Sequence, residues 1–379
     1  MVNNESAMIF SAPGRTEICG NHTDHQHGKV LAAAINLDTR AVVRPNADNV
    51  IRINSEGFTC PDIDLQQLQP VKEEEGTTAA LVRGVAAGIA QLGLPVSGFD
   101  ADVSSTVLPG SGLSSSAAFE VLIGTILNEL GNCGLSPVKI AQIGQYAENV
   151  FFGKPCGLMD QTASSVGNMI TIDFKDPSAP VVKPLDVDFA AFHHSLCIID
   201  SGADHADLTA EYAAIPGELK TLCRCYGKEY LRDLPEDEFW AGLAAARKTA
   251  GDRAVLRAIH VYEDNKRVDG EIAALEAGNF DEFLSLIKES GRSSWMLLQN
   301  ITPTGSTVHQ DLAVALSVCE KLLGGRGACR VHGGGFAGTI QAFVPDDMLQ
   351  KFRTGIEQYL GTGSCHVLNI RREGGVREK

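Results

Sequence analysis

The first hundred residues alternate between short apolar runs and polar, glycine-containing segments. Apolar runs at 8–10, 30–35 and 41–43 are separated by a Pro-Gly dipeptide and a histidine-rich stretch. This alternation predicts a strand, a turn with a loop, and two returning strands. Residues 77–93 carry alanine and leucine at helical spacing, and residues 99–103 alternate apolar and polar positions. These two patterns predict a helix followed by a strand.

The middle of the chain continues this alternation. Residues 114–130 predict a buried helix that begins at a serine cluster, and residues 138–152 predict another that ends at a Gly-Lys-Pro segment. Strands are expected at 169–174 and 195–200, on either side of a proline-rich connection at 177–184. Alternating strands and helices of this kind indicate an α/β or α+β first lobe.

The second half is more helical. A charged, amphipathic pattern covers 235–298, and a second glycine cluster at 324–338 leads into a strand-like run at 339–344. A mixed α+β second lobe is therefore expected. With 379 residues, of which 44% are hydrophobic, the chain exceeds the roughly 250–300 residues at which single cores stop growing. We place the boundary at the proline-rich connection, which gives domains 1–185 and 186–379.

Composition narrows the choice of partners and location. The formal net charge of -15 disfavours nucleic acid and anionic membranes, because both would repel an acidic surface. No apolar run approaches the roughly 20 residues of a membrane span, and the first residues lack the pattern of an export signal. The 10 cysteines form no repeated Cys-x-x-Cys ladder, which favours reduced thiols. We expect a cytoplasmic protein, either a monomer or a weak dimer.

The segment LPGSGLSSSAAFE at 108–120 is suited to holding phosphate. Glycines let backbone N–H groups approach an anion closely, and the N-terminus of the following helix adds free donors and a favourable dipole. The alternative is an ordinary Gly/Ser turn that caps a helix. The candidate nucleotide-binding residues are Pro109, Gly110, Ser111, Gly112, Leu113, Ser114, Ser115 and Ser116.

This segment lacks the lysine of a Walker loop, so a magnesium ion has to neutralise more of the phosphate charge. Serine hydroxyls can ligate Mg²⁺. Ser115 or Ser116 is the candidate ligand, and the carboxylate of Glu148 completes the predicted site.

Polar side chains crowd residues 14–28, between two predicted strands. Arg15 offers a guanidinium for a phosphoryl group or a developing alkoxide, and Asp24 can accept hydrogen bonds from two neighbouring sugar hydroxyls. His22 and Asn21 can read further hydroxyls. The stretch therefore predicts a sugar-binding loop with a catalytic arginine.

The same stretch also offers ligands for zinc, namely Asp24 and the histidines at 22, 25 and 27. Zinc hydrolases usually combine such ligands with a distant ligand and a general base, and the chain has no His-Glu-x-x-His element. A metal site and a solvated turn without a role are the two minor alternatives.

A single acid, Asp160, follows a glycine turn amid apolar neighbours. It is either a helix cap or an active-site acid. Phosphoryl transfer to a hydroxyl needs a group that orients the nucleophile and accepts its proton late in a loose transition state. Arg15 would keep Asp160 ionised, because an adjacent cation lowers the pKa of a carboxylate. Asp160 and Arg15 are the catalytic candidates.

Three separated motifs agree in order and spacing with the GHMP kinase family, and the chain resembles its galactokinase branch. The first loop resembles the sugar signature Gly-Arg-x-x-x-x-Gly-Glu-His-Thr-Asp-Tyr, and residues 109–118 resemble the ATP loop Pro-x-Gly-x-Gly-Leu-Ser-Ser-Ser-Ala. Residues 156–161 are similar to the segment with the catalytic aspartate. The run RVHGGGFAG at 330–338 resembles a third motif, a glycine loop over the phosphates and sugar.

This resemblance implies an ATP-dependent kinase that phosphorylates the anomeric hydroxyl of galactose and uses Mg²⁺. It also implies two lobes with the site between them: an N-terminal α+β lobe with a left-handed β-α-β crossover, and a C-terminal ferredoxin-like lobe. Among the matched positions, Glu148 corresponds to the magnesium ligand, Gly157 and Tyr212 to the sugar pocket, and Gly334 and Gly335 to the nucleotide site.

The sugar signature is altered at two positions: Asn21 stands where the family has glutamate, and His25 where it has tyrosine. In galactokinases that glutamate is associated with the sugar's C6 hydroxyl. A neutral amide removes the repulsion toward an anionic C6 group and can donate to it. Plant galacturonate kinases of this family also lack the glutamate and show Asp-His-Gln. Galacturonate is thus the alternative substrate, with arabinose or N-acetylgalactosamine behind it.

Further departures lie at His332, at Ala337 and at 213–216. A different class of function is also open, because some galactokinase relatives bind sugar and ATP as transcriptional sensors without turnover. Those relatives lose small residues from the ATP loop, whereas residues 114–118 are uninterrupted here. Catalysis is therefore the favoured prediction.

Overall fold

The computed structural model describes residues 7–55, 57–107, 112–154, 156–187, 189–203 and 208–378. The strands are β1 (Met8–Cys19), β2 (Lys29–Pro45), β3 (Val50–Ser55), β4 (Ile63–Asp64), β5 (Phe99–Ser105), β6 (Met169–Asp173), β7 (Val181–Leu185), β8 (His194–Asp200), β9 (Ala328–Val331), β10 (Thr339–Pro345), β11 (Cys365–Leu368) and β12 (Val376–Arg377). The α-helices are α1 (Thr78–Gln91), α2 (Ser115–Leu130), α3 (Pro137–Tyr146), α4 (Met159–Val166), α5 (Thr209–Arg224), α6 (Glu236–Ala250), α7 (Asp252–Glu276), α8 (Phe280–Ser293), α9 (Asp311–Leu323) and α10 (Leu349–Leu360).

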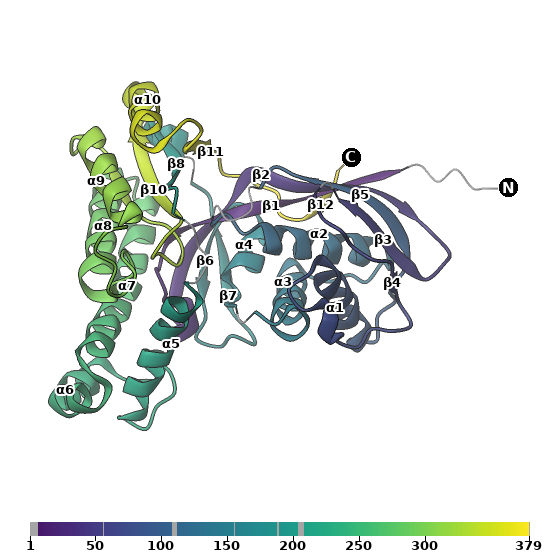
Figure 1. Cartoon of the computed structure of the whole chain (residues 1–379), viewed down its shortest axis with the longest axis horizontal. Helices are drawn as coiled ribbons and strands as arrows, with labels where there is room; N and C mark the ends of the chain where they lie inside the picture. Colours follow the sequence, from purple (N-terminus) through teal and green to yellow (C-terminus); the bar gives the residue numbers. More distant parts are fainter. Residues whose placement is uncertain are drawn as a thin grey trace.

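The first sheet is built around the long strand β2, which pairs with β1, β5 and β6. Its main path runs β12-β1-β2-β5-β3-β4, with β6 and β7 branching from β2. β3 and β5 are parallel, and α1 lies between them in the chain. Figure 1 shows α1, α2, α3 and α4 covering one face of this sheet. The strands predicted at 99–103 and 169–174, and the helices at 77–93 and 114–130, are confirmed.

The predicted turn at the Pro-Gly dipeptide is wrong, because β1 continues through Pro13 and Gly14 as far as Cys19. A register shift between Pro13 and Arg15 marks a bulge there, and a bulge tolerates a proline that cannot donate to the ladder. The polar loop is correspondingly shorter than expected. Arg15 belongs to a strand, and the loop begins at Gly20.

A close helix contact positions one of the predicted site residues. α3 is followed directly by a π-helix, Ala147–Phe152, which carries Glu148. A Cβ on Gly84 of α1 would lie 2.7 Å from the Cβ of Ala147, which is closer than packed carbons approach. Glycine at this position therefore lets α1 press the π-helix toward the sheet, and π-helical turns are often found at functional sites.

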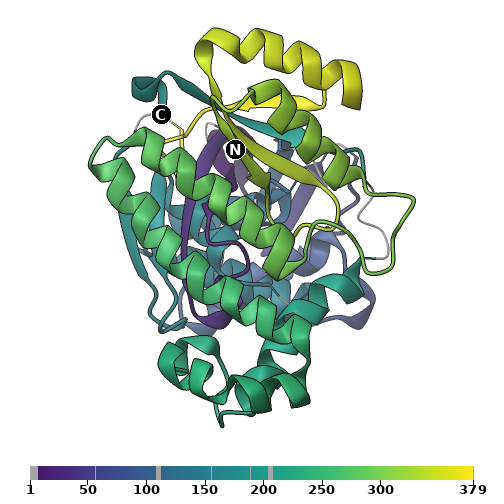
Figure 2. The same ribbon diagram turned by 90° about the vertical axis from the view of Figure 1, so that its left-hand side faces the viewer.

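The second sheet is antiparallel, with strand order β11-β8-β10-β9. Buried residues of α9 and α10 form one core with its strands. A separate core joins both sheets, because Ile18 and Leu31 of the first sheet cluster with Phe283 of α8 and Phe343 of β10. Figure 2 shows the long helices α7 and α8 crossing in front of the first strands. The lobes are thus packed against each other through apolar side chains.

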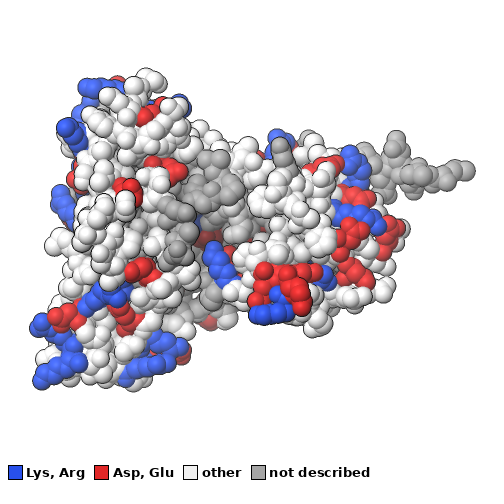
Figure 3. All heavy atoms as spheres, viewed as in Figure 1, with Lys and Arg blue, Asp and Glu red and all other residues white. Residues whose placement is uncertain are grey.

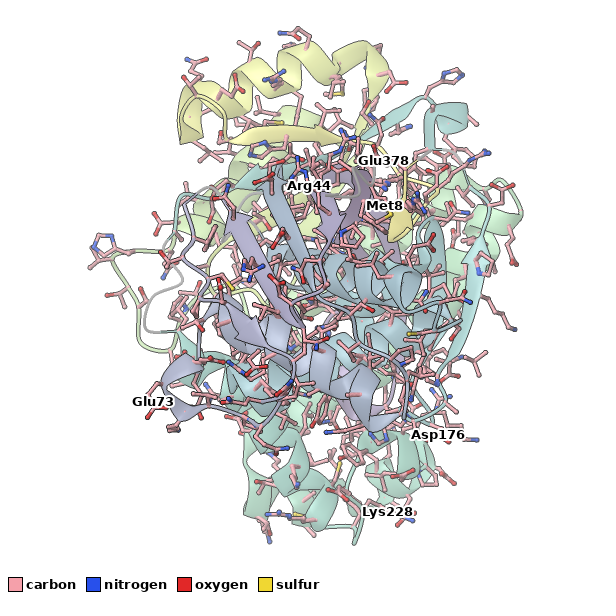
Figure 4. The ribbon with its side chains drawn as sticks, turned by 90° about the vertical axis from the view of Figure 1, so that its right-hand side faces the viewer. Met8, Arg44, Glu73, Asp176, Lys228 and Glu378 are labelled. Carbon is pink, nitrogen blue, oxygen red and sulfur yellow. The ribbon has the colours of Figure 1, made fainter. Side chains whose placement is uncertain are left out.

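The proline-rich connection at 177–184 contains a strand, β7, rather than a linker. Its only partner among the described strands is β6, so Pro184 lies in an edge strand, where proline is tolerated. The two sheets do separate between β7 and β8, close to the expected boundary. However, β12 returns to pair with β1, and Figure 4 shows Met8 and Glu378 at the same end of the first sheet. The division into domains 1–185 and 186–379 stays a prediction.

Charged side chains of both signs are spread over the face seen in Figure 3, and acidic ones gather near the start of α1 and around β3 and β4. Exposed Glu73 and Glu75 precede α1, and Asp62 and Asp102 are exposed near the strands. Among the described helices, we find none that combines the length and apolar character of a membrane crossing.

Candidate active site

Arg15 of β1 contacts both α4 and the glycine loop that precedes α2. Its Nε and Nη2 donate to Oδ1 and Oδ2 of Asp160, each at 2.7 Å. Its Nη1 donates to the carbonyl of Gly112, and its backbone N–H donates to the carbonyl of Leu113 at 3.1 Å. A Cβ on Gly14 would lie 2.8 Å from that same Leu113 oxygen. Only glycine at position 14 lets β1 approach the glycine loop this closely.

Asp160 lies in the first turn of α4 and is held in its charged form. Besides the two bonds from Arg15, it accepts one from the Ser114 hydroxyl. Burial by itself would raise the pKa of Asp160, but the attraction and hydrogen bonds of Arg15 and Ser114 outweigh it and hold the pKa below the usual value. The side chain still has 34% of its surface exposed. Sequence reasoning correctly anticipated the contact between Arg15 and Asp160.

The first glycine loop leads into the N-terminus of α2. Pro109, Gly110 and Ser111 lie outside the described residues. Gly112 has a φ of 70° and Ser114 a φ of 59°, both in the left-handed region that favours glycine. The following residues Leu113, Ser115 and Ser116 are described, and Leu113 is fully buried. The backbone turns sharply here and enters α2, whose first N–H groups, as in any α-helix, have no partner within the helix.

A cluster of carboxylates lies behind the start of α2. Ser116 Oγ is 3.5 Å from Glu148 Oε1, and the Lys154 ammonium is also 3.5 Å from that oxygen. Gln161 Nε2 donates to Glu120 Oε2 at 3.0 Å and to Glu148 Oε2 at 2.9 Å. Burial, followed by repulsion from Glu148, raises the pKa of Glu120 well above its usual value.

Sequence reasoning missed Glu120 and Gln161. A signal for Glu120 was present, because it is the one acid inside the apolar helix predicted at 114–130, apart from Glu129 near its end. Charged residues are rarely buried fully without a partner. Gln161 directly follows Asp160, but nothing in its own sequence context shows that it faces the carboxylates.

The residues around Glu148 fit a magnesium ion rather than zinc. Ser116 and Glu148 supply oxygen ligands, and Ser115 is next to them in the first turn of α2. Mg²⁺ usually takes one or two protein ligands and completes its shell with water and substrate phosphates. Within the described ranges, no three His, Cys, Asp or Glu side chains converge as a metal site. His27 instead stacks on Tyr230, with ring centroids 3.7 Å apart.

His22 is held by two hydrogen bonds at the edge of the predicted sugar loop, residues 20–28. Its Nε2 lies 2.9 Å from the carbonyl of Gly334, and its Nδ1 lies 2.9 Å from Nε2 of His25. A carbonyl can only accept, so Nε2 of His22 carries the proton and His25 donates to Nδ1. Burial lowers the pKa of His25 to about 3, so this ring is neutral at physiological pH. His22 also has a φ of 60°, so this strained residue needs its partners.

Asp24 and Gly157 fit against each other. A Cβ on Gly157 would overlap Oδ2 of Asp24, so only glycine allows the carboxylate to lie there. Burial raises the pKa of Asp24 and the charge of Asp160 adds to the rise, while His22, a backbone N–H of His25 and Arg15 oppose it. The carboxylates of Asp24 and Asp160 therefore lie close enough for the charge of one to affect the pKa of the other.

Tyr212 of α5 covers the second glycine loop, which is the part of the third motif that follows β9 (residues 332–338). Its hydroxyl donates to the carbonyl of Gly335 at 3.0 Å, and its ring packs edge to face on Phe336 with centroids 5.6 Å apart. A Cβ on Gly334 would lie 2.6 Å from the ring. Burial raises the pKa of Tyr212 to about 12, so its hydroxyl remains a donor at neutral pH.

Three successive carbonyls of the second glycine loop accept from three predicted sugar-binding side chains. Asn21 donates to Gly333 at 2.7 Å, while His22 and Tyr212 contact Gly334 and Gly335. The structure therefore brings the sugar loop and the third motif together, although they are about 300 residues apart along the chain.

Asn21 is expected from the sequence to form hydrogen bonds with sugar hydroxyls, but its amide is bonded to other parts of the protein. It is fully buried, and its Nδ2 donates to Glu17 as well as to Gly333. Its Oδ1 accepts from Ser294 and Asn300. All four hydrogen-bonding positions of the amide are thus taken by the protein. Sequence could not reveal this, because three of the four partners come from the second half of the chain.

Comparison with known proteins shows the family of the chain. Residues 80–168 match the family described as "GHMP kinases N terminal domain", and residues 2–45 match the "Galactokinase galactose-binding signature". A galactokinase of Actinobacillus pleuropneumoniae is 32% identical over 375 residues, covering 98% of this chain and 92% of that protein. A galactokinase of Streptomyces coelicolor is 30% identical over 345 residues, covering 90% and 85%.

Solved structures show the same fold. Lactococcus lactis galactokinase complexed with galactose superposes with a TM-score of 0.83 at 24% identity, covering 99% of this chain and 96% of that one. The mevalonate kinase of Methanococcus jannaschii gives a TM-score of 0.68 at 15% identity, covering 97% and 99%. The mixed α+β fold expected from the sequence is confirmed by these likenesses.

Proposed function

Because this chain belongs to the galactokinase family of the GHMP kinases, we propose that it transfers the γ-phosphoryl group of ATP to the anomeric hydroxyl of galactose. The observation that carries this proposal is the Asp160 carboxylate. It is ionised and partly exposed, and Arg15 fixes it between the first glycine loop and the sugar loop. That is the position a group needs to orient a sugar hydroxyl toward a bound phosphate.

The ATP phosphates are proposed to bind at the start of α2. The free backbone donors of this helix and the left-handed turn at Gly112 and Ser114 support an anion site. Gly334 and Gly335 are proposed to approach the phosphates from the second lobe. The buried side chain of Leu113 anchors the loop, so only the backbone of Leu113 is available to the nucleotide.

Ser115 or Ser116, together with Glu148, would hold magnesium. When bound, the ion would neutralise charge on the β- and γ-phosphates. The support for this assignment is the oxygen-only donor set and the 3.5 Å distance between Ser116 Oγ and Glu148 Oε1.

Galactose is proposed to lie against His22, Asp24, Gly157 and Tyr212. Asp24 supplies acceptors for neighbouring hydroxyls. The Nε2–H of His22 and the hydroxyl of Tyr212 donate to glycine carbonyls, so these two side chains would shape the pocket by holding the second glycine loop. Asn21 would act on the sugar indirectly, by holding Glu17 and Gly333 in place.

In the proposed reaction, the anomeric oxygen forms a bond to the γ-phosphorus while the bond to the β–γ bridging oxygen breaks and ADP leaves. Asp160 accepts a hydrogen bond from the hydroxyl and orients it. Because Arg15 and Ser114 keep the pKa of Asp160 low, this carboxylate is a weak base, and proton transfer comes late, as a loose transition state allows. Arg15 also stabilises negative charge that spreads over the γ-phosphoryl oxygens.

Galacturonate remains the second candidate substrate. The observation in its favour is Asn21, which removes a carboxylate from the sugar signature. Against it, the amide of Asn21 has no free donor for a C6 carboxylate. Galactose is therefore the preferred assignment.

The test is a coupled ADP-release assay with Mg-ATP across galactose, galacturonate, arabinose and N-acetylgalactosamine. We expect the highest kcat/KM with galactose. Strong turnover of galacturonate with none of galactose would reverse the assignment. Saturable binding of sugar and ATP with no ADP release would instead indicate a sensor.

The finer features of the fold are proposed on the same family membership. The crossover from β3 through α1 to the parallel strand β5 is proposed to be left-handed, and the second lobe with its four-stranded antiparallel sheet to be ferredoxin-like. A cytoplasmic location is also proposed, with the support that all ten cysteines are free thiols.

A further inference from the structure

Gln161 contacts neither of the surfaces assigned to sugar and phosphate, yet it lies between the two halves of the site. It follows Asp160 in the first turn of α4, and its side chain is fully buried. Asp160 points to Arg15 and Ser114, whereas Gln161 points to the carboxylate cluster. Two neighbouring residues of one rigid helix therefore reach the catalytic carboxylate site and the predicted metal site.

The amide of Gln161 divides its two N–H donors between two acids on different helices. Nε2 lies 3.0 Å from Oε2 of Glu120 in α2 and 2.9 Å from Oε2 of Glu148 in the π-helix. An amide nitrogen carries two hydrogens, so both donors are used. The glutamine thus ties Glu148 to α2, whose N-terminus is the proposed phosphate site.

These hydrogen bonds leave a particular atom of Glu148 available. Gln161 takes Oε2, while Oε1 faces the Ser116 hydroxyl at 3.5 Å and the Lys154 ammonium at 3.5 Å. The carboxylate is therefore held by one oxygen and presents the other to the start of α2. An ion ligand that is oriented in this way binds through one defined oxygen.

We propose that Gln161 is a positioning residue that fixes the Glu148 carboxylate so that Oε1 faces the magnesium ion. The proposal rests on the proposed kinase function and deepens it. Only a neutral donor of this length serves, because an acid at 161 would repel both neighbours and an apolar side chain would leave them unpaired. Since Asp160 is the adjacent residue, the same helix turn sets the distance between the metal ligand and the catalytic carboxylate.

The experiment measures ion binding without turnover in the full-length protein. Mn²⁺ serves as the probe ion and ADP as the nucleotide, and the EPR signal of free Mn²⁺ reports affinity. We expect Gln161→Met, which keeps the length but removes the donors, to weaken Mn²⁺ binding to the ADP complex by about 10- to 100-fold. The dissociation constant for galactose should hardly change, because no predicted sugar contact is altered.

Two further variants make the result specific. Gln161→Glu adds a third carboxylate and should weaken Mn²⁺ binding at least as much. Gln145→Met is the matched control, because Gln145 donates to the nearby Cys156 carbonyl at 3.1 Å but is bonded to neither acid. Its Mn²⁺ affinity should equal that of the wild type. Melting curves of all variants establish that the proteins are folded.

Unchanged Mn²⁺ affinity in folded Gln161→Met protein overturns the inference, even when kcat falls, because Gln161 would then act through Asp160 alone. An equal loss in Gln145→Met also overturns it. Failure of the proposed function looks different: the wild-type protein would then release no ADP with any sugar, whatever the Mn²⁺ affinity of the variants.

Discussion

The Arg15 guanidinium meets the Asp160 carboxylate edge to edge, with two N···O distances of 2.7 Å. Paired bonds of this kind fix orientation as well as charge. Their consequence is a carboxylate that stays ionised beside a sugar loop in which a second carboxylate, Asp24, has its pKa raised. One acid is thus kept ionised to orient a nucleophile, while the other keeps its proton up to a higher pH than an ordinary aspartate does.

Asp160→Asn tests the role of this ionised carboxylate. The amide keeps the shape of the side chain but cannot accept a proton, so we expect kcat to fall by roughly 100- to 10,000-fold. ATP affinity should remain close to that of the wild type, because Ser114 is the only one of the described residues assigned to nucleotide binding that Asp160 contacts, and Arg15 is assigned to the transition state. Steady-state kinetics and nucleotide titration measure the two quantities.

Asp102→Asn is the matched control for that experiment. Asp102 forms an exposed ion pair with Arg44 at 3.1 Å, and exposed pairs contribute little. Its kcat should be unchanged. A near-normal kcat in Asp160→Asn would remove Asp160 from the catalytic assignment.

Much of the candidate site could be predicted from the sequence because it depends on local patterns. The glycine and serine run before α2, the polar stretch with His22 and Asp24, and the acid at 160 each carry a recognisable residue type in a recognisable context. The structure brings these segments to one place. Local patterns also located β5, α1 and α2, since their periodicity reflects burial on one face.

What could not be predicted depends on partners distant in the chain. Asn21 reads as a surface residue of a polar loop, and only the positions of Ser294, Asn300 and Gly333 show that it is buried. In the same way, the contacts of Gln161 with Glu120 and Glu148 become visible only in the structure. Pro13 and Gly14 predict a turn by composition, but pairing with β2 overrides that preference and leaves a bulge.

His25→Phe tests whether His25 fixes the proton position on His22. Without a donor to Nδ1, His22 loses one of the two partners that favour the proton on Nε2, and only the Gly334 carbonyl remains. We expect KM for galactose to rise by about tenfold, equal to about 1.4 kcal/mol, with a smaller change in kcat. ¹⁵N NMR of the imidazoles should show a mixture of tautomers at His22.

His27→Phe is the matched control. His27 is the next histidine in the loop, but it stacks on Tyr230, and phenylalanine can stack there too. Its KM and the His22 tautomer should stay as in the wild type. The same Nε2–H tautomer of His22 in both variants would contradict the role given to His25.

Glu271→Gln is predicted to change how stability depends on pH. Glu271 is fully buried in α7, and burial raises its pKa from 4.5 to about 8, with Asp264 adding to the rise and Cys19 and Arg330 opposing it. Between these two pH values the unfolded chain has lost the proton and the folded chain has kept it. The free energy of unfolding therefore falls as pH rises through this window, by up to roughly 5 kcal/mol, and levels off above it.

The glutamine variant has no proton to lose, so its free energy of unfolding should lack this component. Urea unfolding at pH 5 and pH 8 gives the difference for each protein, and the wild type should lose more stability than Glu271→Gln. Glu276→Gln, on the exposed face of the same helix, should behave as the wild type. Equal pH dependence in all three proteins would contradict the raised pKa.

Asn21→Asp separates a structural role of Asn21 from direct sugar contact. The change replaces the donating nitrogen by an oxygen that faces Glu17 Oε1 and the Gly333 carbonyl, now 3.1 and 2.7 Å from Nδ2. A buried charge would result in which one oxygen faces two acceptors and has no donor, so the free energy of unfolding should fall by at least about 3 kcal/mol. Asn54→Asp places a carboxylate beside Asp102 on the exposed surface of β3 and should cost less than about 1 kcal/mol. If Asn21 instead touches the sugar, Asn21→Asp keeps its stability and changes only the preference between galactose and galacturonate, which unfolding curves and the ADP-release assay measure independently.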